Sequence, residues 1–322
     1  MPMQVYDVSG LGGYLAVPEL TKKVRFRALA TLKFGQFVRP EPGIGPKRSG
    51  TFYFDKVASD LSVTPTYLSD RLTEDQPIPE DTISIAQGSL MVYEYGRAVS
   101  YSAKLTTLGQ IAIEPIVEQV LRNRLAKVLD AIHAYAFRQS GVYYIPTGPT
   151  SATIGTNGVP SATATSNWNA YHHRNLIDYM RDTLRVPPYF SDTDEYVCVC
   201  TGKFLRGLYD DPDFEHVQVY AEPQNRLRGE VGRYYFTRFV WTNHAGALSN
   251  SVGQNGVLGE AIVFGEDPVI HGVVVAPEIR AKQSERDFGR SMALAWYGLV
   301  GSGPTWVYST DGEARSVLVT SA

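Results

Sequence analysis

The strongest pattern of apolar and polar positions lies between Ile111 and Gly141. Apolar residues recur there at steps of three and four: Val117, Leu121, Leu125, Val128, Ile132 and Tyr135. This spacing places one apolar stripe on a helix, so we predict a long helix with a buried stripe. Pro115 suits the first turn of such a helix, and Gly141 suits the position just past its end. Four charged residues fall on the other faces, where we expect solvent: Arg122, Arg124, Lys127 and Asp130.

Strand-like patterns precede this helix. Residues 50–57 are predicted to form one strand, and residues 87–102 a longer one. A polar stretch with two prolines, residues 68–85, separates them. We therefore predict a tall hairpin. Such a hairpin is only marginally stable alone, and it gains stability when it lies on another subunit.

The segment after the long helix alternates between loop, helix and strand patterns. Residues 142–166 are rich in Gly, Ser, Thr, Ala and Pro, which predicts a surface loop or linker. Asn167 is a candidate cap for a helix over residues 168–184. A short buried strand at 196–201 and a short helix at 204–209 are expected next. This alternation favours a compact α/β or α+β domain.

The two ends of the chain differ in pattern. Residues 1–49 are interrupted by glycines and prolines, which predicts an extended arm that finds its partners outside its own core. The last third of the chain has mostly strand patterns. The predicted strands there are residues 229–243, 261–265, 269–275, 287–299, 305–309 and 315–320.

Composition and charge narrow the class of protein. The chain has 322 residues, of which 43% are hydrophobic and 20% charged, as in a folded globular protein of one to three domains. Its net charge of −3 gives no reason to expect a general attraction to nucleic acid. The first 50 residues are basic, with eight Lys and Arg against three Asp and Glu. We interpret them as a basic arm that lies on the acidic body of the same or a neighbouring copy, rather than on nucleic acid.

Membrane and secretion signals are not evident in the sequence. The N-terminus lacks the basic region and apolar run of a signal peptide, and no run of 18 apolar residues occurs. Cys198 and Cys200 would share one face of a strand, where we expect buried free thiols in a reducing compartment.

Catalytic motifs are also missing. No nucleophile elbow, phosphate-binding loop or His-Glu-x-x-His motif is present. Six scattered histidines are expected to be solvated or hydrogen-bonded: His133, His172, His173, His216, His244 and His271. The adjacent His172 and His173 would diverge by about 100° on a helix and so could not bind one metal together.

Two acidic clusters are candidates for metal sites. The first, Asp210, Asp211 and Asp213, lacks the spacing of a calcium loop and is expected to form a capped turn. The second is expected to be a solvated loop and comprises Asp192, Asp194 and Glu195. We therefore predict no catalytic residue, no metal and no cofactor. A hydrolase that uses Asp210, Asp211 and His216 remains an alternative.

Four short motifs, in this order, carry a resemblance to a known family. They are Leu72-Thr-Glu74 with Pro77, Tyr95-Gly-Arg-Ala-Val-Ser100, Gly229-Glu-Val-Gly232 with Arg238-Phe-Val240, and Asp287-Phe-Gly289 followed by Ala295-Trp296. Together with the order of arm, hairpin, long helix and α/β region, they resemble the major capsid proteins of tailed bacteriophages, in a subfamily known from short-tailed phages. Asp75 and Ala295 depart from this pattern, because glycine is usual at both positions.

The resemblance implies an α+β protein with the HK97-like fold. Its expected parts are an N-terminal arm (1–49), an extended hairpin or E-loop (50–105), a P-domain with the spine helix and the following loop (106–166), an A-domain (167–262) and returning strands of both domains (263–322). The implied function is a major capsid protein, not an enzyme, that assembles as hexamers and pentamers of an icosahedral shell around double-stranded DNA.

The resemblance also implies partners and a location. The main partner would be further copies of the chain, with a separate scaffolding protein, a portal, packaged DNA bound without sequence specificity and, in some relatives, a decoration protein. The location would be the virion, assembled in the bacterial cytoplasm, with no membrane. Some relatives link a hairpin lysine to a neighbour's asparagine, but Lys56 is the only lysine in residues 50–103 and no partner for it can be assigned.

Candidate contacts between subunits come from the hairpin tip and the arm. They are Leu72, Thr73, Glu74, Lys22, Lys23, Arg25 and Arg27. Two other classes stay open at this point. One is an encapsulin-like compartment shell of the same fold, and the other is a tail or decoration protein of the virion.

Overall fold

The computed structural model describes most of the chain after the predicted arm. The described residues are 32–41, 50–59, 71–72, 74, 78, 80, 83–109, 111–158, 163–214, 230–249, 259–283, 290–308 and 313–322. The predictions for most of the arm, for much of the hairpin tip and for His216 lie outside these ranges.

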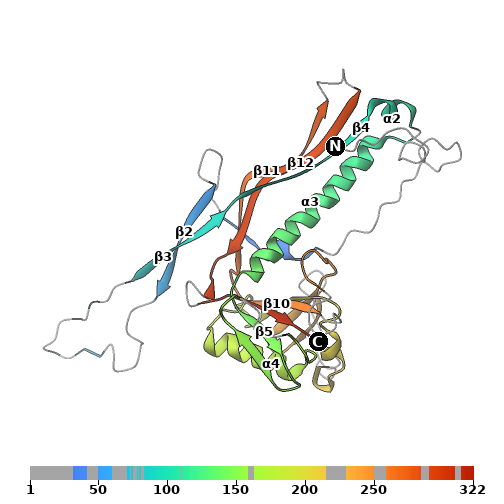
Figure 1. The fold of residues 1–322 in the computed structure, drawn as a ribbon. Coiled ribbons are helices and arrows are strands. Elements are labelled where there is room, and N and C mark those ends of the chain that lie inside the picture. The colour runs from blue at the N-terminus through green and yellow to red at the C-terminus, as the bar shows by residue number, and fades with distance from the viewer. Residues whose placement is uncertain are drawn as a thin grey trace.

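A long helix and a long sheet form the elongated half of the molecule (Figure 1). Helix α3 spans Ile113–Arg138 and confirms the predicted helix. It runs along a four-stranded sheet with the order β1-β11-β12-β4. The elements of this half are β1 (Arg39–Pro40), β4 (Tyr93–Ser102), the short helix α2 (Ala103–Leu108), β11 (Val269–Gln283) and β12 (Ser291–Pro304).

The apolar stripe of α3 is buried only in its first half. Val117 and Leu121 pack with Tyr101 and Trp296 of the sheet. Tyr135, by contrast, is 64% exposed, so its predicted burial is wrong. In the second half of the helix, the buried face shifts around the helix because other elements cover it.

Asp130 is the clearest exception to the predicted solvent face of α3. The side chain is buried, because the 3-10 turn η1 (Phe34–Gln36) covers that part of the helix. Gly141 has the expected left-handed conformation, with φ of 90°. It lies three residues beyond the last helical residue rather than directly after it.

A seven-stranded sheet forms the compact half of the molecule at the C-terminal end of α3 (Figure 1). Its strand order is β6-β5-β13-β10-β7-β9-β8, with β7–β9 and β5–β13 parallel and the other pairs antiparallel. The strands are β5 (Tyr143–Pro146), β6 (Ala152–Gly155), β7 (Tyr196–Cys200), β8 (Glu230–Tyr234), β9 (Thr237–Trp241), β10 (Glu260–Phe264) and β13 (Ser316–Thr320).

The helical segments beside this sheet include α4 (Ala170–Asp178), the π-helical turn η2 (Tyr179–Thr183) and α5 (Arg206–Tyr209). Strands β7 and β10 are buried along their whole length, as expected for central strands covered on both faces. Cys198 and Cys200 are buried and free, as predicted. No helix in the described ranges is long and apolar enough to cross a membrane.

Several predicted boundaries in the compact half are wrong. Residues 142–166 are not a linker, because they contain β5 and β6, and Tyr144 and Ile145 are buried in the core. Asn169, not Asn167, caps α4, since its side chain accepts a hydrogen bond from the backbone N–H of His172. The predicted strand 229–243 is a hairpin of β8 and β9 that turns at Tyr235 and Phe236, both with positive φ.

The other corrections concern strands of the elongated half. The predicted strand 287–299 runs on to Pro304, and residues 305–308 are not a strand. The predicted strand 87–102 is divided at Val92 into β3 (Ser84–Met91) and β4. Strand β4 joins the four-stranded sheet, whereas β3 pairs with β2 (Thr51–Ser59) in a separate ribbon that projects from the body (Figure 1).

Candidate assembly surface

The projecting ribbon of β2 and β3 has an exposed outer face that carries large apolar side chains beside polar ones. Alternation along the strands places Tyr53 and Val57 of β2 on this face, together with Ile85 of β3, which pairs directly with Val57. Val57 is 58% exposed and Ile85 is 70% exposed. The polar pair of Asp55 and Gln87 separates Tyr53 from the pair of Val57 and Ile85 on this face. Large apolar side chains this exposed on a projecting element point to an interaction surface.

The inner face of the ribbon packs on its own chain. Leu90 is buried beside Gly303 of β12, and a Cβ atom at Gly301 would lie only 2.3 Å from the backbone oxygen of Met91. Within the ribbon, Gly88 leaves room for the ring of Phe54. The two faces therefore differ, because the inner face finds partners within the chain and the outer face is left in solvent.

A groove of about 530 Å³ continues this surface from the root of the ribbon to α3. The described residues that line it are all uncharged. The large exposed apolar and aromatic side chains along it are Met91, Tyr93 and Tyr135. Tyr135, which the helical pattern assigns to the core, thus belongs to an exposed aromatic and apolar area beside the ribbon.

The predicted contact residues are only partly described. Leu72 and Glu74 are exposed at the tip of the ribbon, as a contact with another subunit requires. Thr73 and the four basic residues of the arm lie outside the described ranges. The structure therefore does not test their predicted roles.

Asp130 anchors the first described residues to the long helix. One carboxylate oxygen accepts hydrogen bonds from the backbone N–H groups of Lys33, at 3.1 Å, and Phe34, at 2.9 Å. The other lies 2.9 Å from Nδ1 of His244. The Phe34 ring packs on Phe137 of α3, with ring centroids 5.4 Å apart. Lys33 and Phe34 of the predicted arm are therefore fixed to α3. The sequence pattern did not reveal this contact because it placed Asp130 in solvent.

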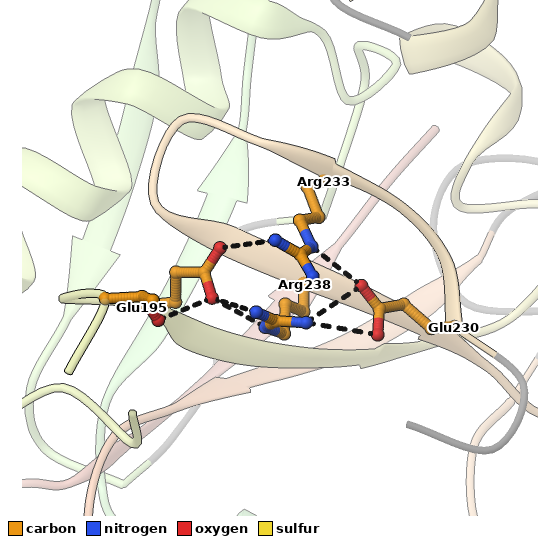
Figure 2. Close-up of polar contacts among 5 residues, drawn as sticks. Glu195, Glu230, Arg233 and Arg238 are labelled. Carbon is orange, nitrogen blue, oxygen red and sulfur yellow. Dashed lines mark hydrogen bonds and ion pairs between the residues drawn. The ribbon is translucent and has the colours of Figure 1, made fainter. Parts of the chain in front are cut away.

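A buried ion-pair network holds the edge of the seven-stranded sheet (Figure 2). Arg238 of β9 is fully buried between Glu195, which precedes β7, and Glu230 of β8. Its Nε donates to Glu195 at 2.6 Å, and its Nη1 donates to both oxygens of Glu230, at 3.3 and 3.4 Å. Arg233 lies on the other side of both carboxylates, 3.1 Å from Glu230 and 3.5 Å from Glu195. The four formal charges cancel.

This network corrects the expectation for the second acidic cluster. Asp192 and Asp194 are exposed, as predicted, but Glu195 is turned inward to meet Arg238. Phe190 adds to the contact, because the guanidinium of Arg238 lies 4.9 Å from its ring centroid. The segment before β7 is therefore tied to the β8–β9 hairpin.

Two of the histidines expected to be scattered lie together where α3 meets the long sheet. The rings of His133 and His271 have centroids 4.7 Å apart, and each Nδ1 lies 2.9 Å from the hydroxyl oxygen of Ser302. Burial, and to a lesser degree the neighbouring His271, lowers the pKa of His133 from 6.5 to about 4. Burial also lowers the pKa of His271.

The adjacent His172 and His173 diverge, as predicted. His172 bonds to the backbone oxygen of Gly148 at 2.8 Å, whereas the ring of His173 packs on Phe239 inside the core. Burial lowers the pKa of His173 to about 4. Both rings are thus structural parts of the region around α4.

The first acidic cluster makes local structural contacts. Asp211 accepts hydrogen bonds from the backbone N–H groups of Ala170, at 3.0 Å, and Asp213, at 3.1 Å. Asp213 in turn lies 3.4 Å from Arg174. Within the described ranges, no group of three or more His, Cys, Asp or Glu side chains is placed to hold a metal ion.

Comparisons with known proteins identify the fold. No protein-family model and no curated protein sequence matches the chain. Solved structures match over almost the whole length. The capsid of cyanophage Pam1 has a TM-score of 0.68 at 12% identity and covers 95% of this chain and 96% of its own. The capsid of Ralstonia phage GP4 has a TM-score of 0.65 at 14% identity, with 94% and 95% covered.

A third capsid structure, from Helicobacter pylori bacteriophage KHP30, has a TM-score of 0.63 at 10% identity and covers 98% of this chain and 96% of its own. At these identities the likeness establishes the fold. The α+β chain, with its projecting ribbon, its long helix beside a long sheet and its compact seven-stranded region, has the HK97-like fold found in these phage capsids, as predicted from the sequence.

Proposed function

We propose that this chain is a major capsid protein of a tailed bacteriophage, which assembles as hexamers and pentamers of an icosahedral shell around double-stranded DNA. The observation that carries this proposal is the match to capsid chains over 94 to 98% of the chain, with most of each matched chain covered as well. The likeness is not limited to one domain, since it includes the elements that project from the body. The proposed role is structural, with no catalytic step.

The exposed surface of the ribbon supports this proposal independently. A shell subunit makes heterologous contacts, in which different surfaces of identical copies meet. The ribbon and the uncharged groove beside it present two such surfaces on one chain. We propose that the outer face of the β2–β3 ribbon lies on a neighbouring subunit, where Val57 and Ile85 become buried.

The remaining expectations belong to the same proposal. The division into arm, E-loop, P-domain, A-domain and returning strands is proposed as predicted from the sequence. The basic residues Lys22, Lys23, Arg25 and Arg27 are proposed to contact the mildly acidic surface of a neighbour. A scaffolding protein, a portal and packaged DNA are proposed partners, and the virion, assembled in the host cytoplasm, is the proposed location.

We expect the outer face of the ribbon to be essential for assembly. The double variant Val57→Lys/Ile85→Glu removes the apolar pair but keeps a favourable cross-strand pair, so the ribbon itself should persist. Each subunit contact would lose the apolar burial of two side chains, which is worth roughly 1.5 to 3 kcal/mol for each side chain that becomes fully buried. Analytical ultracentrifugation should then find folded subunits and no shells.

The matched control is the exchanged pair Val57→Ile/Ile85→Val, which keeps the apolar surface and should assemble. Circular dichroism of all variants checks that the body remains folded. Normal shells from the charged double variant would contradict the proposed contact.

A further inference from the structure

Lys56 connects the projecting ribbon to the body of its own chain. It lies on the inner face of β2, and its Nζ donates a hydrogen bond to the backbone oxygen of Thr305 at 3.2 Å. The same ammonium lies 5.0 Å from the ring centroid of Trp306 and 5.9 Å from that of Phe54. A cation over an indole ring is attracted by the negative face of the ring, and this attraction strengthens as water is excluded.

The receiving side of this contact is a fixed part of the body. Trp306 is only 8% exposed. The guanidinium of Arg315 also lies over this ring, 5.2 Å from its centroid. The segment is held at both ends, because the N–H of Thr305 donates to the oxygen of Pro268 and the N–H of Tyr308 donates to the oxygen of Ser140. Trp306 therefore offers Lys56 a rigid surface.

The ribbon has few other contacts that could fix its direction. Its strands pair with each other and with no third strand among the described residues. At its root, Leu90 is buried beside Gly303, and the N–H of Val92 donates to the oxygen of Gly50. A ribbon held only at its root can swing about it.

Lys56 supplies a second fixed point at a distance from the root. Leu90 pairs with Phe52, and Ala86 pairs with Lys56, four residues further along the strands. At about 3.3 Å per residue, this separates the two contacts by roughly 13 Å. Two contacts at that separation fix a direction, which one contact alone does not.

We propose that Lys56 is a positioning residue: its contact with Thr305 and Trp306 fixes the angle at which the ribbon leaves the body before a neighbour binds. Only the consequence for assembly rests on the proposed function. A ribbon already held at the correct angle loses less conformational freedom when it docks, so the contact favours assembly. The amine of Lys56 is thus engaged within its own chain rather than presented to a neighbour.

The test measures the direction of the ribbon in unassembled full-length subunits. Spin labels are attached to the exposed positions Ile85→Cys, on the ribbon, and Tyr135→Cys, on α3, because the native cysteines are buried. Double electron–electron resonance should give a narrow distance distribution in this labelled chain. Lys56→Met should at least double its width. Lys56→Arg keeps a cation and hydrogen-bond donors, so its distance distribution should be as narrow as that of the labelled chain without a Lys56 substitution. The exposed control Lys282→Met should also leave the width unchanged.

The same substitutions, without labels, test the consequence for assembly. Lys56→Met should raise the concentration needed for shell formation about fivefold, and Lys56→Arg should not. Equal distance distributions with and without the Lys56→Met substitution would overturn the positioning role even if both chains form shells. A broadened distribution with unchanged assembly would overturn its importance for assembly. A narrow distance distribution in a chain whose unlabelled wild type never forms shells would support the positioning role of Lys56 and contradict the proposed function instead.

Discussion

Replacing Arg238 with methionine is expected to lower the free energy of unfolding by about 3 to 5 kcal/mol. The substitution removes the fully buried guanidinium between Glu195 and Glu230 and leaves the partly exposed Arg233 as the arginine that pairs with both carboxylates. A carboxylate that loses its partner in the core keeps the cost of its desolvation and no longer gains the attraction that offset it. Urea unfolding of unassembled subunits at neutral pH measures the loss.

The control is the same substitution at an exposed ion pair. Arg122 pairs with Glu118 on the surface of α3, so Arg122→Met should change stability by no more than about 0.5 kcal/mol. Adding Glu195→Gln and Glu230→Gln to Arg238→Met should recover part of the loss, because two buried charges are removed. Equal small effects of Arg238→Met and Arg122→Met would show that the buried network does not hold the sheet edge.

Acidification from pH 7.5 to pH 5 is expected to cost the unassembled subunit about 4 kcal/mol. His133 and His173 have ordinary pKa values of 6.5 and folded pKa values of about 4. Because the folded pKa is the lower one, the unfolded chain takes up protons first. The contribution of these two histidines to the free energy of unfolding is therefore fully present above pH 6.5 and is lost as the pH falls toward 4. At pH 5 each histidine contributes about 2 kcal/mol of this loss.

Urea unfolding at a series of pH values measures the acid effect. His133→Gln keeps a hydrogen-bonding group near Ser302 but removes one titrating ring, so it should lose about half of the dependence between pH 6.5 and 5. The lowered pKa of His271 and His172 acts in the same direction and would steepen the curve. A free energy of unfolding that stays constant from pH 6.5 to 5 would contradict the assigned burial of these rings.

The long helix was predictable because its signal is local. Its apolar residues recur with the period of the helix itself, and Gly141 indicates that the helix ends nearby, which it does at Arg138. The strands β7, β10 and β13 were predictable for the same reason, since each is a short apolar run that is buried along nearly its whole length. In these segments the nearest neighbours in sequence contain most of the information.

Other segments depend on partners that are distant in sequence. Residues 142–166 have the composition of a loop, yet β5 forms because it pairs with β13 from the end of the chain. The apolar pattern of residues 87–102 is continuous, and only the different partners of β3 and β4, namely β2 and β12, divide it at Val92. Asp130 has the sequence context of a solvent-facing residue, and it is buried because η1 and His244 come from other parts of the chain.

The candidate site was predictable in outline but not in its residues. Two strand patterns with a polar stretch between them predicted a projecting hairpin. The outer face with its exposed apolar side chains could not be recognised, because alternation alone does not say which face finds a partner within the chain. Lys56 and Trp306, far apart in sequence, became a pair only when the structure placed the inner face of the ribbon against the body.

The most direct test of the central claim is cryo-electron microscopy of the purified chain, expressed alone and together with a candidate scaffolding protein. The account predicts closed shells or hexameric rings in at least one condition, with the outer face of each β2–β3 ribbon covered by a neighbouring subunit. Single subunits or small discrete trimers under both conditions would contradict a role as a major capsid protein and would favour a decoration protein of the virion.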